Sequence, residues 1–133
     1  MKVYLSVPMV ANRALGRAQL MAKAIKDSGG EVSSPWVLGP IERSSQSVVD
    51  VFQRDMKGAE DCDVLVADVT QPSVGVGMEI MAAYKSGRRV ILVSKKGEMV
   101  SRMLQHMDRK ETIEYEKDDE VYRKLRRALQ SIL

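Results

Sequence analysis

The hydrophobic pattern of the chain switches repeatedly between short apolar runs and longer segments with helical spacing. The short runs have the length of strands, and we expect five of them, at residues 3–7, 31–32, 64–69, 89–94 and 112–115. The longer segments carry apolar residues every three or four positions, which predicts helices at residues 13–27, 45–60, 78–85, 98–107 and 118–132. Strands and helices therefore alternate along the whole chain.

This alternation predicts an α/β fold, a doubly wound parallel sheet of about five strands with helices on both faces, in the Rossmann-like or flavodoxin-like manner. The run at residues 64–69 is apolar almost throughout, which is typical of a strand covered on both faces. Ligands of such folds bind beyond the carboxyl ends of the strands. We therefore expect a site where residues 7–13, the end of the central strand and residues 94–101 meet.

Two of the predicted loops contain distinctive residues. Asn12 stands where its side chain could cap the first helix, and Ser28, Gly29 and Gly30 would end that helix. Residues 33–41 contain two prolines, a glycine and Trp36, which predicts an irregular surface loop. Loops of this kind often cover binding sites.

The most informative segment is residues 63–80, DVLVADVTQPSVGVGMEI. We expect Gly75 and Gly77 to form a turn whose backbone N–H groups face an anion, and Glu79 to fall in the first turn of the following helix. There Glu79 should stay ionised near neutral pH, and a preoriented carboxylate beside an anion site suggests a nucleophile. A glutamate in a first turn is also common as a dipole partner worth ~0.3–1 kcal/mol, so the residues alone leave both interpretations open.

The glycine spacing excludes one class of function. Gly75 and Gly77 are not followed by a third glycine at the spacing of the dinucleotide fingerprint, so we do not expect a nicotinamide cofactor.

Composition narrows the remaining classes. The 133 residues, 44% of them apolar, fit a single domain over residues 1–133, and the net charge of +3 is mild. We expect the basic residues near the C-terminus to form a solvated helix face, and the few aromatic residues argue against nucleic-acid binding.

Cys62, the only cysteine, is expected in the core, and His106 lacks partners at metal-ligand spacing, so we expect no metal. With no apolar run of ~18 residues and no signal peptide, we expect a soluble cytoplasmic protein.

Residues 63–80, together with residues 3–5, 54–55 and 99–101, resemble the 2'-deoxynucleoside 5'-monophosphate N-glycosidases, or N-hydrolases, within the nucleoside 2-deoxyribosyltransferase superfamily. The resemblance covers most of the chain and is most specific from Asp55 to Glu79. It implies a single nucleoside-deoxyribosyltransferase-like domain without a cofactor. It also implies hydrolysis of the N-glycosidic bond through a covalent glycosyl-Glu79 intermediate, giving free base and 2-deoxyribose 5-phosphate.

The resemblance assigns roles to individual residues. Glu79 is the nucleophile, Asp55 assists departure of the base, and Tyr4 orients the nucleophile. Ser73 binds the substrate phosphate, and Ser101 reaches the site from the partner subunit of a homodimer. The remaining substrate-binding residues are implied by the motif or by loop position: Gly75, Gly77, Arg13, Val7, Pro8, Met9, Val10, Ala11 and Asn12.

Several alternatives stay open. The family tends to have a glycine-serine pair in its first loop where this chain has residues 6–13, SVPMVANR, so the preference for base and sugar is open. Trp36 could stack on a base or anchor its loop. Met78, Met81, Met99, Met103 and Met107 have the spacing of core residues but could also line a dimer interface. Base exchange between nucleosides, ribonucleotide cleavage and a non-catalytic nucleotide sensor are the alternative functions.

Overall fold

The computed structural model describes the backbone of residues 1–41 and 45–132 and the side chains of residues 1–41 and 50–132. Its strands form one parallel sheet in the order β2-β1-β3-β4-β5. The strands are β1 (Lys2–Ser6), β2 (Glu31–Val32), β3 (Val64–Asp68), β4 (Arg89–Lys95) and β5 (Lys110–Tyr115). The helices are α1 (Leu15–Asp27), the short 3-10 helix η1 (Pro35–Leu38), α2 (Ser45–Asp61), α3 (Val74–Lys85), α4 (Arg102–His106) and α5 (Asp118–Gln130).

This order is that of flavodoxin-like folds, in which the chain reverses its direction of progress between β1 and β3. The predicted doubly wound parallel α/β fold with about five strands is confirmed. In such sheets the crevice beside the reversal point, at the carboxyl ends of the strands, is the usual ligand site.

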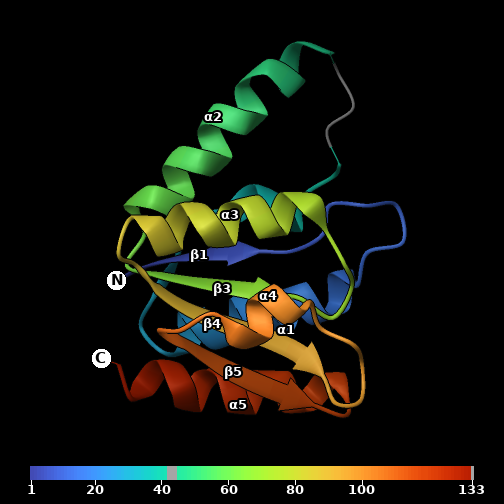
Figure 1. Ribbon diagram of the computed structural model, residues 1–133, viewed down its shortest axis with the longest axis vertical. Coiled ribbons are helices and arrows are strands. Elements are labelled where there is room, and N and C mark those ends of the chain that lie inside the picture. Colours follow the sequence, from blue (N-terminus) through green and yellow to red (C-terminus); the bar gives the residue numbers. More distant parts are fainter. Residues whose placement is uncertain (42–44, 133) are drawn as a thin grey trace.

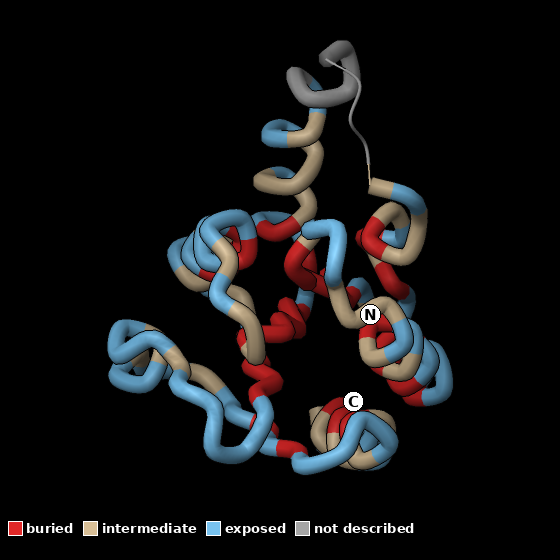
Figure 2. Tube along the Cα trace, turned by 90° about the vertical axis from the view of Figure 1, so that its right-hand side faces the viewer, coloured by how far each residue is buried: buried red, intermediate tan, exposed pale blue. Residues whose placement is uncertain are grey.

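Helices cover both faces of the sheet, with α1 and α5 on one side and α2, α3 and the short α4 on the other (Figure 1). The division follows the two-residue period of the strands. Val3 and Leu5 of β1 pack on the α1 and α5 side, whereas Tyr4 packs on the α2 and α3 side. Buried residues run through the middle of the molecule, while α2 stands away from the sheet and is buried near its C-terminal end, at Ala59 (Figure 2).

Local sequence explains the central elements. All five residues of β3 are buried, as expected of a strand covered on both faces. The final helix places Asp118, Asp119 and Glu120 in its first turn and Arg127 in its last, which suits the helix dipole.

The start of α3 differs from the prediction. Ser73 caps this helix by accepting a hydrogen bond from the Val76 N–H at 3.3 Å, so the helix begins at Val74 rather than Met78. Gly75 and Gly77 are therefore helical residues and do not form a turn. Glu79 is the sixth residue of α3 and lies in its second turn, so its predicted place in the first turn is wrong.

Two further predicted helix ends are wrong. Arg13 N–H donates to the Val10 carbonyl at 3.0 Å, which closes a turn around Asn12. The first helix then begins at Leu15, after Ala14, without a side-chain cap, so Asn12 does not cap it.

The fourth helix spans only Arg102–His106 instead of residues 98–107. In the predicted irregular loop at residues 33–41, Pro35–Leu38 forms η1.

Among the helices that the structure describes, none has the length and apolarity needed to cross a membrane.

Candidate active site

Glu79 lies in the layer between β1, α2 and α3, with only 7% of its surface exposed. Tyr4 and Ser6 are fully buried members of β1. Because alternate residues of a strand point to the same face, their side chains share the side of the sheet that α2 and α3 cover. Asp55 and Arg54 approach the same carboxylate from α2 and act on it electrostatically. The three residues predicted to be catalytic, Tyr4, Asp55 and Glu79, are therefore brought together.

The environment of Glu79 changes its acid strength. Burial raises the pKa of its carboxyl from 4.5 to about 7, and the negative charge of Asp55 adds to this effect. The nearby hydroxyls of Tyr4 and Ser6 and the positive charge of Arg54 lower the pKa of Glu79 and so act in the opposite direction. The expectation that Glu79 stays ionised near neutral pH is therefore wrong, because both forms are populated at pH 7.

Tyr4 remains a proton donor in this site. Burial, followed by the neighbouring Glu79, raises the pKa of its phenol far above the ordinary value. Within the described part of the chain, neither the Tyr4 hydroxyl nor Ser6 Oγ completes a hydrogen bond of normal geometry, although both lie beside Glu79. Buried hydroxyls without partners are costly, and they are typical of functional sites.

A chain of contacts holds the outer side of the site. Arg54 Nε pairs with Asp55 Oδ1 at 3.0 Å, and the Arg54 guanidinium lies 4.2 Å from the centre of the Trp36 ring. The Trp36 ring in turn meets the Tyr4 ring edge to face, with their centres 6.1 Å apart. This packing is that of a loop anchor, because one face of Trp36 is already covered by Arg54.

The predicted phosphate-binding residues lie away from Glu79, with Ser73 at the start of α3 and Ser101 at the start of α4. Ser73, Gly77 and Ser101 line a groove of about 1110 Å³ between α3 and α4. Ser101 is exposed at the start of α4 and makes no capping hydrogen bond. Gly75 is exposed, and a Cβ on Gly75 or Gly77 would have nothing within 4 Å. The backbone in the first turns of α3 is thus open to a ligand.

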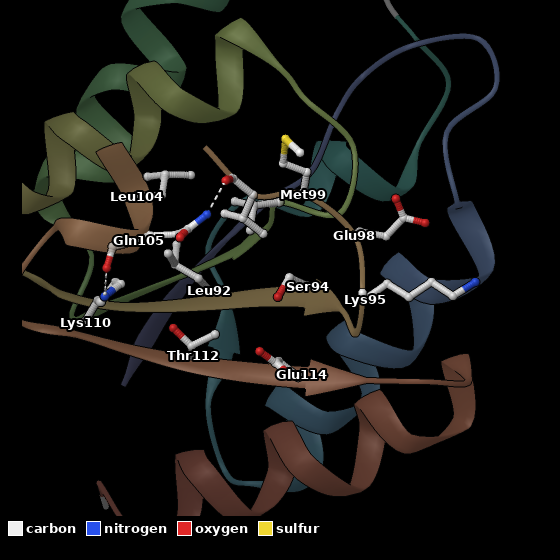
Figure 3. Close-up of a pocket in the computed structure, with 13 residues that line it drawn as sticks. Leu92, Ser94, Lys95, Glu98, Met99, Leu104, Gln105, Lys110, Thr112 and Glu114 are labelled. Atoms are coloured by element: carbon white, nitrogen blue, oxygen red, sulfur yellow. Dashed lines mark hydrogen bonds between the residues drawn. The ribbon is translucent and has the colours of Figure 1, made fainter. Parts of the chain in front are cut away.

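A smaller hollow of about 370 Å³ lies beside this groove, over β4 and β5 (Figure 3). Ser94, Thr112 and Glu114 line it from the strands. Its rim is tied together by two hydrogen bonds, from Gln105 Nε2 to the Val100 carbonyl at 2.6 Å and from Lys110 Nζ to the Gln105 carbonyl at 3.1 Å. None of the predicted site residues lines this hollow.

Arg13 connects the first loop to η1. Its guanidinium donates to the Val37 carbonyl at 2.8 Å, to the Gly39 carbonyl, and to Met9 Sδ at 3.1 Å. Of the other loop residues predicted to bind substrate, Val7 and Pro8 are buried, Met9 is half-buried, and Val10, Ala11 and Asn12 are exposed.

Sequence reasoning did not assign Ser6 or Arg54 to the site. Ser6 had a usable signal, because it stands two residues after Tyr4 in the same predicted strand and must share its face. Arg54 had no signal of its own, since an arginine beside an aspartate on a helix is an ordinary surface pair. No three His, Cys, Asp or Glu side chains in the described residues gather in a way that could hold a metal ion.

The profile of the family described as Nucleoside 2-deoxyribosyltransferase matches residues 3–129. The chain belongs to this family. A protein of Thermofilum pendens named "Putative 2'-deoxynucleoside 5'-phosphate N-hydrolase 1" is 36% identical over 109 residues, which cover 78% of this chain and 76% of that protein. The family resemblance seen in the sequence is thereby confirmed.

Solved structures of other proteins share the fold. A CMP N-glycosidase from Clostridium botulinum superposes with a TM-score of 0.70 at 22% identity, covering 94% of this chain and 98% of that one. A 2-deoxyribosyltransferase from Bacillus psychrosaccharolyticus gives a TM-score of 0.69 at 23% identity, covering 92% and 90%.

The buried carboxylate predicts a stability effect that is independent of activity. In the unfolded chain Glu79 loses its proton near pH 4.5, whereas in the folded chain it keeps it up to about pH 7. Folding stability therefore falls as the pH rises through this window. Glu79→Gln has no charge to bury, so we expect its free energy of unfolding at pH 8 to exceed that of the wild type by about 2–3 kcal/mol.

Urea unfolding of both proteins at pH 5 and pH 8 measures this difference. At pH 5 the gap should narrow to under about 1 kcal/mol, because the wild-type carboxyl is then largely protonated in the folded state. Glu98→Gln, at an exposed position, serves as the control and should match the wild type at both pH values. A Glu79→Gln variant no more stable than the wild type at pH 8 would contradict the burial of a charged carboxylate.

Proposed function

We propose that the protein hydrolyses the N-glycosidic bond of 2'-deoxynucleoside 5'-monophosphates, releasing the free base and 2-deoxyribose 5-phosphate. The observation that carries this proposal is the buried Glu79 carboxylate set against the Tyr4 phenol and the charge of Asp55. The family membership and the N-hydrolase name of the 36% identical relative support it. Two neighbouring carboxylates of unlike environment are what glycosidic bond cleavage requires.

The first half of the proposed reaction forms a covalent intermediate. The ionised Glu79 carboxylate attacks C1 of the deoxyribose, the C–N bond breaks, and its electron pair leaves with the base. In this step the two carboxyl groups share one proton, which is on Asp55 and passes to the departing base, while the Tyr4 hydroxyl donates to Glu79 and fixes its orientation. A deoxyribose lacks the electron-withdrawing 2-hydroxyl, so the positive charge that develops on the sugar is easier to form.

The second half releases the sugar. A water molecule attacks C1, Asp55 takes its proton, and the C–O bond to Glu79 breaks, which restores the carboxylate and yields 2-deoxyribose 5-phosphate. The raised pKa of Glu79 suits the first half of this cycle, because a more basic carboxylate in a dry site is a stronger nucleophile. With a pKa of about 7 it is still basic so weakly that it can leave in the second half.

The start of α3 provides a site for the substrate phosphate in this proposal. Ser73 Oγ accepts the Val76 N–H, which leaves its own proton free to donate to a phosphate oxygen. The helix dipole and the exposed backbone of Val74 and Gly75 favour an anion at this end. Glu79 follows Ser73 by six positions, a rise of ~9 Å along the helix. Because Glu79 faces β1 and α2, a sugar phosphate that contacts both residues has to bend around the start of α3.

We also propose a homodimer that covers the groove between α3 and α4. Four apolar side chains that line this groove are exposed in the single chain: Val74 (84%), Met81 (42%), Met99 (91%) and Met103 (80%). Met78 does not line the groove but is also exposed (44%), so these methionines are not core residues. A patch of this kind is typical of an interface. A second copy packed here would bring its exposed Ser101 toward the neighbouring site.

The proposed reaction is tested with a panel of dGMP, dCMP, dAMP and dTMP, the matching deoxynucleosides, and GMP and CMP, with base release followed by chromatography. We expect release from the deoxynucleotides, and rates for deoxynucleosides at least about tenfold lower because the phosphate contacts are lost. Glu79→Gln should lower the rate by at least about 10³-fold, since it removes the nucleophile.

The alternatives give different results in the same panel. Base exchange would produce a new nucleotide or nucleoside when excess free base is added, and ribonucleotide cleavage would release base from GMP or CMP faster than from dGMP or dCMP. A nucleotide sensor would bind deoxynucleotides without turnover over hours. Any of these three outcomes would contradict deoxynucleotide hydrolysis.

The phosphate site predicts opposite effects for two substitutions of Ser73. Aspartate caps helices as well as serine does, so Ser73→Asp should keep the stability of the protein within about 0.5 kcal/mol, whereas Ser73→Ala should lose about 1 kcal/mol. The charge of Ser73→Asp should repel the phosphate and lower kcat/KM for deoxynucleotides about 100-fold. Its activity on deoxynucleosides should not fall, and a variant with full activity on deoxynucleotides would refute the assignment.

The shared site is tested by mixing two inactive variants. Glu79→Gln and Ser101→Ala should each be impaired, but a mixed dimer has one site with both wild-type residues if Ser101 acts across the interface. After subunit exchange, activity should return to about a quarter of the wild-type value, because half of the dimers are mixed and half of their sites are intact. No recovery would mean that Ser101 does not act in trans.

The interface itself is tested at Met103. Met103→Glu places a charge on the proposed contact and should convert the dimer to a monomer in sedimentation experiments. Arg123→Glu, at an exposed position of α5 on the opposite side of the sheet, should leave the oligomeric state unchanged. A wild-type protein that sediments as a monomer would refute the dimer.

A further inference from the structure

The Tyr4 ring occupies a slot between α2 and η1. On the α2 side stands Gly58, where a Cβ atom would lie 2.7 Å from Tyr4 Cε2 and 3.0 Å from Cδ2, closer than any real side chain approaches. Trp36 completes the slot, because its ring meets that of Tyr4 at an interplanar angle of 66° and its Cη2 would lie 3.9 Å from the same Cβ atom. The phenol can therefore stand where it does only because residue 58 has no side chain.

Glycine at this position is needed for space and not for its backbone conformation. Gly58 lies inside α2 and is not among the glycines with positive φ, which are Gly29, Gly87 and Gly97. A glycine in a helix interior costs about 1 kcal/mol relative to alanine. This loss of helix stability is offset because glycine lets α2 approach β1 closely. Because Asp55 precedes Gly58 by one helical turn, the same approach brings Asp55 toward Glu79.

We propose that Gly58 is a positioning residue, which together with Trp36 forms the slot that holds the Tyr4 hydroxyl against Glu79. The catalytic consequence rests on the proposed function, whereas the placement of the phenol does not. The groups that face Glu79 are Tyr4 and Ser6 from β1 and Asp55 and Arg54 from α2. The contact with Tyr4 does most to lower the pKa of Glu79, ahead of that with Ser6 and the charge of Arg54, so a displaced phenol should raise that pKa.

The chain provides its own reporter, because Trp36 is the only tryptophan and forms one wall of the slot. We expect the fluorescence of Trp36, titrated without substrate, to follow Glu79 with a midpoint near its pKa of about 7. Glu79→Gln should remove this transition. Gly58→Ala should raise the midpoint by about half a pH unit or more, since the phenol can no longer reach the carboxylate.

Gly16 supplies the matched control. It is a glycine inside α1, where an added Cβ would have nothing within 4 Å, so Gly16→Ala should titrate as the wild type does. In a Tyr4→Phe background the hydroxyl is already absent, and adding Gly58→Ala should cause no further shift. Base release from dGMP should fall about ten- to a hundredfold in Gly58→Ala and remain unchanged in Gly16→Ala.

A stability cycle decides the case if Gly58→Ala folds poorly. With Tyr4→Ala the ring is gone, so Gly58→Ala should then be tolerated and should stabilise the helix, as alanine normally does. Equal destabilisation by Gly58→Ala in both backgrounds would overturn the slot, as would a Gly58→Ala variant whose Trp36 titration matches the wild type. The fluorescence and stability measurements need no turnover. They therefore test whether Gly58 positions Tyr4 even if no deoxynucleotide is cleaved.

Discussion

The burial of one carboxylate is the constraint on which the rest of the site depends. Glu79 sits in a layer between β1, α2 and α3 that would otherwise be packed with apolar groups, and water reaches only 7% of its surface. Burying a charge is costly unless neighbouring groups stabilise it. The surrounding hydroxyls and Arg54 do this only in part, which leaves a group whose charge is easily gained and lost. The reactivity proposed for Glu79 and the reduced stability expected at neutral pH thus have the same physical origin.

The sequence is sufficient to predict the overall architecture, and the reasons are visible in particular elements. The apolar run of β3 cannot be satisfied at a surface, and the acidic start and basic end of α5 suit one helix direction only. The boundaries that were wrong depend on capping and packing, which outweigh the conformational preference of single residues. Glycines 75 and 77 suggest a turn, yet the Ser73 cap and the packing of the buried Val76 begin the helix before them.

The site was predicted less completely than the fold. The family resemblance identified Tyr4, Asp55 and Glu79, but nothing in the local pattern indicated that Glu79 is buried, because burial is decided by β1 and α2, which lie far away in sequence. The contact of Gly58 with the Tyr4 ring is hidden for the same reason. Ser73 and Ser101 line a groove on another side of α3 from Glu79. The predicted site therefore has two parts, the group around Glu79 and this groove, and α3 connects them. In the proposed dimer, the second chain would connect them as well.

The link made by Arg13 has a consequence for how this protein can tolerate sequence change. Two of the groups that Arg13 holds are main-chain carbonyls, those of Val37 and Gly39, and every amino acid offers the same carbonyl. Substitution of the exposed side chains in either loop would therefore leave these two hydrogen bonds of Arg13 intact. In evolution, the exposed side chains of these loops could change while the main-chain hydrogen bonds keep the two loops together.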